Sequence, residues 1–495
     1  MSEDPTRYEG GQPTTPYLDA IAARGLRGST RFHVPGHKGG PSADPGLVGA
    51  IGERALLLDL AHGLEGIDIG PSPTPYESAE ALAAEWYGAK RTFFLTNGAT
   101  QGNHSLLLAL APPGSTVAVQ RNAHASIIDG LVLSGGNPVW VQPDLDEDLG
   151  IAHGVSPEAL EEALSRAPEA SAVFVVSPTY FGWCADVEGL ARVAHAHGAA
   201  LCVDQSWGAH FGAHPEVPAS ALALGADAVL TSTHKTVGSL TQSAMLHVAD
   251  SDLVDVAQVE RCVRIMRSTS PSTLLNASLD SARRQLATHG EDLLDRTLAS
   301  AADLRKRINE IPGCRVVGWF GKDSDGRMGW DPLRVAIDVR GTGRTGYEIS
   351  RDLRELHDTH VELKSQSTIL IVLGLADSAS QMVRFAHDLT GVVARSGETS
   401  GSTAEVVRPP ESVEDGMRMT PRDAFLGPTE RVSVKDAPGR ISAETVAAYP
   451  PGIPALLPGE EITTDLVSYL RLVLESGGRL HGAGDPSFET VLVVA

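Results

Sequence analysis

Short apolar runs alternate with helical patterns along residues 90–235, and this alternation restricts the fold more than any other feature of the sequence. The segments between the runs, such as "NHSLLLAL" and "VEGLARVAHAHG", carry apolar residues at helical spacing. Strands that alternate with helices form mainly parallel sheets covered by helices. We therefore expect an α/β fold with strands at "RTFFLT", "STVAVQ", "PVWVQ", "SAVFVVSP", "AALCVDQ" and "DAVLTST".

The rest of the chain indicates further domains, because 495 residues are too many for one compact core. After residue 300, "SAADLRKRINEI" is typical of a helix, and "LRVAIDV" and "QSTILIVLGL" are typical of strands, so a smaller α+β domain is expected. A stretch rich in Ser, Gly and Glu then has the composition of a linker. The predicted divisions are an arm at 1–30, a large domain at 31–298, a small domain at 299–395, a linker at 396–416 and a C-terminal domain at 417–495.

Charge and hydropathy exclude several classes of function. The formal net charge of −22 argues against nucleic acid and anionic membranes as partners. No apolar run approaches the ~20 residues of a membrane span, and the N-terminus lacks the apolar core of a signal peptide, so we expect a cytoplasmic protein. None of the four cysteines stands in a CxxC pair, and Cys202 is expected in the core. We predict no metal site, since Pro35 and Gly36 break any helix that would align His33 with His37.

Polar residues follow the predicted strands at the sheet edge where ligands of open parallel sheets bind. The first strand leads into "TNGATQGNHS", a helix start whose free N–H groups suit a phosphate, although small polar residues also cap many helices. His124 follows another strand, where it is either structural or a ring that stacks on a flat ligand. This edge therefore offers a candidate phosphate cradle and a candidate stacking ring.

Two later strands end in ionisable residues. Asp204 follows an apolar strand, where a carboxylate can cap a helix or hold a protonated ring nitrogen. Lys235 follows the next strand together with Ser232 and His234, and lysine is rarely buried unless it is paired or used. A phosphate cradle, a stacking ring, a carboxylate and a lysine are the set that pyridoxal 5′-phosphate requires, so we expect this cofactor.

Together these motifs resemble the Orn/Lys/Arg decarboxylase family of fold-type I pyridoxal-phosphate enzymes. The resemblance covers most of the chain from about residue 31, and it follows the short form of the family because only about 30 residues precede the first motif. Several separated motifs occur in the family's order. They are "RFHVPGHKGG", "TNGATQGNHS", "RNAHASI", "VDQSWGAHF", "STHKTVGSLTQ", "STSPS" and the tail from "MTPRDAF" to "PGIPALLPGEEI".

The resemblance implies a role for each matching residue. Lys235 would anchor the cofactor covalently, Asp204 would pair with the pyridine nitrogen, and His124 would stack on the ring. The family's active site lies at a dimer interface, which implies a homodimer or a larger homo-oligomer in which Thr269 or Ser270 comes from the partner subunit. Gln101 departs from the small hydroxyl residue that many members carry. The remaining cofactor contacts fall on Ala99 (through its backbone), Thr100, Ser232, His234 and Trp207.

The implied reaction is α-decarboxylation of a basic L-amino acid, with lysine, ornithine and arginine all open as substrates and polyamine synthesis as one role. Lys235 or His234 would protonate Cα, and a carboxylate would meet the distal cation of the substrate. An aminotransferase, another pyridoxal-phosphate reaction and a non-catalytic relative remain alternatives, because fold and cofactor do not choose the reaction. In an aminotransferase, Arg344 or Arg351 would take the α-carboxylate. The candidate substrate carboxylates are Asp68, Glu65 and Glu460.

Overall fold

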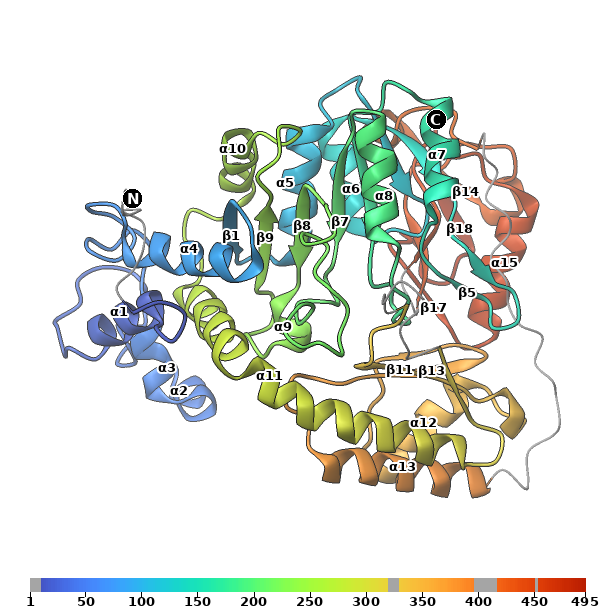
Figure 1. The fold of residues 1–495 in the computed structure, drawn as a ribbon. Coiled ribbons are helices and arrows are strands. Elements are labelled where there is room, and N and C mark those ends of the chain that lie inside the picture. The colour runs from blue at the N-terminus through green and yellow to red at the C-terminus, as the bar shows by residue number, and fades with distance from the viewer. Residues whose placement is uncertain (1–9, 319–328, 396–415, 450–452) are drawn as a thin grey trace.

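A seven-stranded sheet forms the centre of the protein, as the computed structural model shows for residues 10–318, 329–395, 416–449 and 453–495 (Figure 1). The strand order is β1-β9-β8-β7-β6-β2-β3, and β9 alone runs antiparallel to the other six. The predicted α/β fold with a mainly parallel sheet is therefore confirmed. The strands are β1 (Arg91–Leu95), β2 (Thr116–Gln120), β3 (Asn137–Val141), β6 (Ala172–Val176), β7 (Ala200–Asp204), β8 (Ala228–Thr231) and β9 (Ala244–Val248).

Helices cover both faces of this sheet because successive strand side chains point to opposite sides. On one face, α5 (Gly98–Leu110), α6 (Ala125–Ser134) and α10 (Val256–Met266) share a core with Phe174 and Cys202. The prediction that Cys202 lies in the core is confirmed. The helices α7 (Pro157–Arg166) and α8 (Val187–Ala196) cover the other face, where their apolar residues pack against Val173, Leu201 and Val203.

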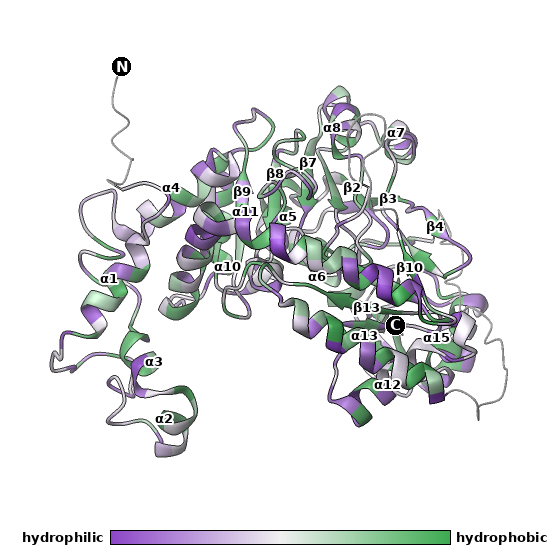
Figure 2. Cartoon of the chain, turned by 60° about the horizontal axis from the view of Figure 1, so that its bottom comes forward, coloured by the Kyte–Doolittle hydropathy of each residue, from purple (hydrophilic) through white to green (hydrophobic). Residues whose placement is uncertain are grey.

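The small α+β unit lies below the large sheet in Figure 1 and is reached through one long helix, α11 (Thr273–Asn309). This helix runs through the predicted boundary at residue 298 and includes the helix predicted from "SAADLRKRINEI". Figure 2 shows hydrophobic and hydrophilic residues alternating in bands along α11 and its neighbours, as expected of amphipathic helices. The unit contains β10 (Arg315–Val317), β11 (Arg334–Asp338), β12 (Leu363–Lys364), β13 (Thr368–Val372), α12 (Gly346–His357) and α13 (Ala379–Ala394).

The C-terminal segment forms two small sheets around a separate apolar core. The predicted linker lies outside the described residues except for Gly416. Among the parts of the chain that are described, no helix is long and apolar enough to cross a membrane. The C-terminal elements are α14 (Pro421–Leu426), β14 (Thr429–Ser433), β15 (Val446–Tyr449), β16 (Ile453–Leu456), α15 (Thr464–Glu475), β17 (Arg479–His481) and β18 (Thr490–Val494).

The N-terminal segment packs on the large domain through α1 (Pro16–Gly25). The Asp280 carboxylate on α11 accepts a hydrogen bond of 3.0 Å from the backbone N–H of Tyr17. Arg283 lies one turn further along α11 and donates to the carbonyls of Gln12 and Thr14. Both Asp280 and Arg283 are buried, so the arm is fixed by a paired charge and backbone hydrogen bonds. Between the arm and β1 lie α2 (Pro45–Ile51), α3 (Glu53–Leu58) and α4 (Pro75–Tyr87).

Candidate active site

Lys235 lies one turn beyond the carboxyl end of β8, on the short helix α9 (Thr233–Thr236). The turn begins with a hydrogen bond of 3.0 Å from the Lys235 N–H to the Ser232 carbonyl. The small domain holds its other end, because the backbone N–H of Leu375 donates to the Thr236 carbonyl at 2.9 Å. Lys235 Nζ rests 3.8 Å from the centroid of the Trp207 ring. The strand end, the small domain and Trp207 together position the amine.

The environment of Lys235 favours its neutral form. Burial lowers the pKa of Lys235 to about 8, and this effect outweighs the attraction of the Asp204 carboxylate. The guanidinium of Arg334 lowers the pKa in the same direction. A lysine with such a pKa is partly deprotonated near neutral pH and can react as a nucleophile.

Asp204 ends β7 and is 6% exposed. Its Oδ2 accepts a hydrogen bond of 2.9 Å from Asn103 Nδ2, and its Oδ1 accepts one of 3.0 Å from the Ser206 N–H. Asn103 also donates to Ser126 Oγ at 2.9 Å, and that hydroxyl lies 2.8 Å from His124 Nδ1. Asp204 and His124, which were chosen separately from the sequence, therefore belong to one hydrogen-bonded network, in which Asp204, Asn103 and Ser126 are buried and His124 is exposed.

Asn103 and Ser126 were not identified from the sequence. Asn103 lies in "TNGATQGNHS" one helical turn after Ala99, so its spacing indicates the same face of the helix. Ser126 stands two residues after His124, and its N–H donates to the imidazole of His124, which caps the N-terminus of α6. Asn103 could have been identified by counting one helical turn from Ala99 in the predicted phosphate cradle.

The surroundings of His124 and His234 favour the uncharged imidazole. Burial lowers the pKa of His124, although the nearby Asp204 carboxylate works in the opposite direction. Burial also lowers the pKa of His234, and the charge of Lys235 adds to this effect. His124 Nδ1 accepts the hydrogen bond of 3.2 Å from the Ser126 N–H, so its ring orientation is fixed. A neutral, fixed imidazole is suited to stacking on a flat aromatic ligand.

The predicted phosphate cradle lies at the N-terminus of α5, a helix of 13 residues. Ala99 and Thr100 are in its first turn, where the N–H groups have no helical partner. Gln101 is buried and accepts from the Asn97 N–H, while its amide donates to the Val263 carbonyl. Gln101, the residue that departs from the family pattern, therefore stabilises the start of α5 from the protein interior.

The residues present fit pyridoxal 5′-phosphate. Ser206 Oγ and Thr233 Oγ1 are buried without a hydrogen-bond partner among the described residues, next to Asp204 and Lys235 respectively. Unsatisfied buried hydroxyls are rare unless a ligand or water completes them. A helix N-terminus, a carboxylate and a lysine of lowered pKa surround them, which is the donor set that this cofactor requires.

The other residues predicted to bind cofactor are divided between the site and the surface. Trp207 is buried, and both Lys235 Nζ and the Arg334 guanidinium lie against its ring. Thr269 and Ser270 are exposed in the loop between α10 and α11. Their predicted contribution to the site of a partner subunit stays a prediction.

Two of the predicted substrate carboxylates lie in the loop before α4. Asp68 accepts hydrogen bonds of 3.1 Å from the N–H groups of Gly63 and Leu64 and pairs with His62 at 3.3 Å. Burial works to raise the pKa of Asp68, but His62 and the two N–H groups outweigh it and hold the pKa below its usual value. Glu65 is exposed. Asp68 therefore stabilises its own loop, whereas Glu65 faces solvent.

Glu460, the third candidate, lies where the C-terminal domain meets the large sheet. It pairs at 3.0 Å with Arg121, which follows β2. Arg121 also donates to the carbonyls of Pro454 and Ala455 and lies over the Trp140 ring. Burial raises the pKa of Glu460, and Arg121 partly offsets this effect. The pair joins two domains.

We expect Arg121→Met to destabilise the protein by about 2–4 kcal/mol, because it leaves a buried carboxylate unpaired. The folded state of this variant would hold the Glu460 proton more tightly than the unfolded chain, so its stability should fall further as pH rises from 5 to 8. Urea unfolding at both pH values measures this. Adding Glu460→Gln should recover much of the loss, and equal losses in the single and double variants would contradict the pairing.

Arg334 is a buried cation that was not predicted. It is the first residue of β11, its side chain is 0% exposed, and its guanidinium lies 3.8 Å from the Trp207 ring centroid. Burial lowers the pKa of Arg334 to about 10. By contrast, Arg344 and Arg351 pair with Asp352. Arg334 could have been identified from the sequence, because it is an arginine inside the apolar run "LRVAIDV".

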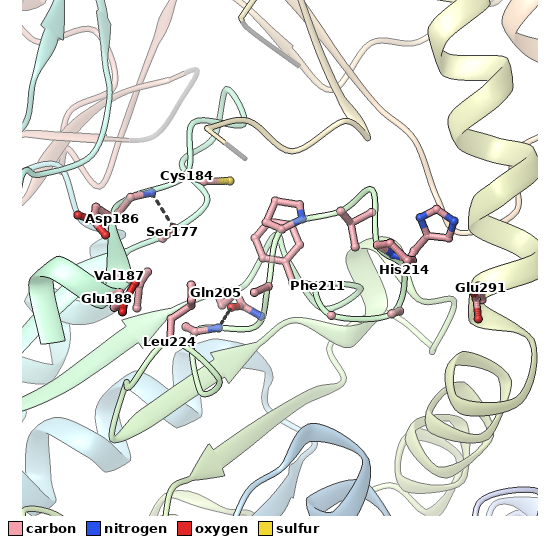
Figure 3. Close-up of a pocket in the computed structure, with 18 residues that line it drawn as sticks. Ser177, Cys184, Asp186, Val187, Glu188, Gln205, Phe211, His214, Leu224 and Glu291 are labelled. Carbon is pink, nitrogen blue, oxygen red and sulfur yellow. Dashed lines mark hydrogen bonds between the residues drawn. The ribbon is translucent and has the colours of Figure 1, made fainter. Parts of the chain in front are cut away.

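A cavity of about 740 Å³ lies beside this site (Figure 3). Ser177 and Gln205, which follow β6 and β7, contribute to its wall, and Glu291 of α11 lies at its far side. Lys235 is not among its lining residues. The cavity includes Gln205, the neighbour of Asp204 in the chain, but not Lys235 itself.

Comparison with known proteins gives matches along almost the whole chain. Residues 15–330 match the family model described as Orn/Lys/Arg decarboxylase, major domain, and residues 411–485 match Orn/Lys/Arg decarboxylase, C-terminal domain. The chain is 37% identical to an arginine decarboxylase of Bacillus subtilis over 98% of both chains, and 35% identical to one of Bacillus anthracis over the same shares. The constitutive lysine decarboxylase of E. coli has a similar fold, with a TM-score of 0.81, 20% identity, and coverage of 98% of this chain and 82% of that one.

Proposed function

Since the chain belongs to the Orn/Lys/Arg decarboxylase family, whose members decarboxylate basic L-amino acids with pyridoxal phosphate, we propose that this enzyme converts L-arginine to agmatine and carbon dioxide. One observation carries the choice of arginine. Relatives named arginine decarboxylase are 35–37% identical and cover 98% of this chain, whereas the lysine decarboxylase of Pseudomonas aeruginosa is 24% identical over 92%. Lysine and ornithine are the competing substrates.

The residues around Lys235 would hold pyridoxal 5′-phosphate. Once bound, the cofactor supplies an electron sink for the pair left behind when the bond from Cα to the carboxylate breaks. Lys235 would hold its aldehyde carbon, Asp204 its ring nitrogen and His124 one face of its ring. The phosphate and the remaining edge would contact Ala99, Thr100, Ser232, His234 and Trp207.

Lys235 and His234 are the groups that we propose move a proton at Cα. Lys235 has a pKa of about 8, so its ammonium form gives up a proton readily near neutral pH. His234 precedes it on α9. Asp204 accepts hydrogen bonds from Asn103 Nδ2 and the Ser206 N–H, which fix the carboxylate that would pair with the ring nitrogen.

The distal guanidinium of arginine requires a carboxylate, for which Asp68, Glu65 and Glu460 remain the proposed residues. Asp68 is engaged by His62 and Glu460 by Arg121, whereas Glu65 is exposed. Glu65 is therefore the first of the three to substitute.

We also propose a cytoplasmic homodimer, or a larger homo-oligomer, that feeds polyamine formation. Large apolar side chains are exposed along residues 26–69, including Phe32 at 95% and Val34 at 67%. Apolar surface of this kind favours a covering partner. In the proposed dimer, Thr269 or Ser270 of one subunit would contribute to the site of the other.

Release of carbon dioxide from carboxyl-labelled arginine, lysine and ornithine tests the proposal. We expect kcat/KM for arginine to exceed that for the other two by at least about tenfold, because an arginine-sized pocket discriminates through its polar contacts. Preference for lysine or ornithine would reject arginine as the substrate. A keto acid that accumulates with an acceptor, without carbon dioxide, would indicate an aminotransferase.

A further inference from the structure

We propose that Asn103 and Ser126 are positioning residues that hold the proton of His124 on Nε2, an inference that rests on the proposed cofactor-dependent reaction. His124 is exposed, whereas Asn103, Ser126 and Asp204 are buried. An exposed ring that is held by buried hydrogen bonds keeps its orientation before a ligand arrives. The direction of each hydrogen bond in this chain follows from the groups at its two ends.

The Asp204 carboxylate fixes the first end of the chain. An ionised carboxylate only accepts hydrogen bonds, so the Asn103 side chain must present its nitrogen to Asp204 Oδ2, which lies at 2.9 Å. The amide nitrogen carries two hydrogens, and the second is donated to Ser126 Oγ at 2.9 Å. Both hydrogens of Asn103 Nδ2 are therefore used, and the Ser126 hydroxyl is an acceptor in this contact.

The backbone of Ser126 fixes the other end. Its N–H can only donate, and it donates to His124 Nδ1 at 3.2 Å. The Ser126 hydroxyl lies 2.8 Å from the same nitrogen, and because it accepts from Asn103, its own hydrogen completes this contact. His124 Nδ1 therefore accepts both hydrogen bonds and carries no proton, so the neutral ring has its proton on Nε2.

This arrangement opposes protonation of His124, because a proton on Nδ1 would break both hydrogen bonds to that nitrogen. A neutral imidazole also avoids repulsion with the protonated ring nitrogen that Asp204 would hold. Asn103 donates toward both residues, so one side chain fixes the partner of the ring nitrogen and, through Ser126, the ring that would stack on the cofactor.

The titratable groups around His124 act on its pKa independently of this chain. Desolvation lowers the pKa of His124, and the charges of Lys235 and His481 act in the same direction. The Asp204 carboxylate acts in the opposite direction. His104 of α5 also interacts with the His124 ring. All four groups are retained when a hydroxyl of the chain is removed, so the resulting change in the pKa of His124 reports on that hydroxyl.

NMR of protein that contains isotopically labelled histidine distinguishes the two tautomers without cofactor or substrate, and the His124 signals are assigned by their loss in His124→Gln. We expect the Nε2–H tautomer in the wild type. Ser126→Ala should raise the pKa of His124 by about half a unit to one unit, the range of one net hydrogen bond. In the loaded enzyme, the pH at which kcat falls on acidification should rise by the same amount, while KM stays within about twofold.

Three further variants separate positioning from general support of the fold. Ser126→Thr keeps the hydroxyl and should restore the wild-type pKa of His124. Asn103→Leu removes the donor that orients this hydroxyl, so it should raise the pKa in the same direction as Ser126→Ala. Ser105→Ala is the matched control, because it removes another buried hydroxyl, which donates to the Gln101 carbonyl within α5, and it should leave the pKa of His124 unchanged.

The inference is overturned by an Nδ1–H tautomer in the wild type, by an unchanged His124 pKa in Ser126→Ala, or by an equal shift in Ser105→Ala. Failure of the proposed substrate has a different signature. Carbon dioxide would then be released from lysine or ornithine rather than arginine, while the tautomer and the pKa shift would be found as expected, and the pH dependence of kcat would be measured with that amino acid.

Discussion

Replacing Lys235 with alanine should reduce carbon dioxide release from arginine by at least about a thousandfold. In the proposed reaction the Lys235 amine is the nucleophile, and burial lowers its pKa to about 8, which favours its reactive neutral form. The visible absorbance that arises from a lysine–cofactor linkage should also disappear. Both quantities are measured on protein incubated with pyridoxal phosphate.

Lys90→Ala is the matched control for this experiment. Lys90 is an exposed lysine that pairs with Asp250, so its loss should leave the rate of carbon dioxide release and the absorbance within about twofold. If Lys235→Ala kept a tenth of the wild-type rate, the assignment of the lysine would be wrong.

Asp204→Asn should lower kcat by about a hundredfold to a thousandfold with a small change in KM. The substitution removes the negative charge that would face the protonated ring nitrogen but keeps the size of the side chain. An amide also accepts poorly from both Asn103 and the Ser206 N–H, since only its oxygen is an acceptor. Steady-state kinetics of carbon dioxide release measures the effect, and Asp204→Glu should recover part of it.

The control for this variant is Asp227→Asn. Asp227 is also buried beside the large sheet, but it lies at the opposite end of β8 and accepts from the Leu201 N–H and Ser251 Oγ. Its replacement should lower the free energy of unfolding while the folded protein keeps its kcat. Equal losses of kcat in the two variants would show that Asp204 acts through folding alone.

The large sheet and its polar edge were predictable because both depend on local sequence. A buried strand needs only a short apolar run, and a residue such as Lys235 stands out directly after it. Strand β9 was not predicted, although "AMLHV" is equally apolar. It enters the sheet antiparallel between β1 and β8, and the choice of such neighbours depends on long-range packing rather than on the run itself.

The parts of the site that were not predicted depend on pairs far apart in the chain. Arg334 contacts Trp207 across two domains, and nothing in either local sequence specifies this approach. Glu460 was chosen for its acidic context, yet its partner Arg121 lies 339 positions away. Periodicity reports which face of an element is buried, but the partner of a buried charge emerges only when the domains pack.

The long separations of these contacts also have a consequence for biosynthesis. The turn that carries Lys235 is completed by Leu375, and the strand end beside His124 is completed by Glu460 through Arg121. A ribosome that adds about 5–20 residues per second needs roughly ten to forty-five seconds to travel from Lys235 to Glu460. During that interval the nascent chain holds its reactive lysine on an unfinished scaffold. We expect cofactor capture to be a late, post-translational event, and a transcript cut short before the C-terminal domain to yield a lysine motif without a working enzyme.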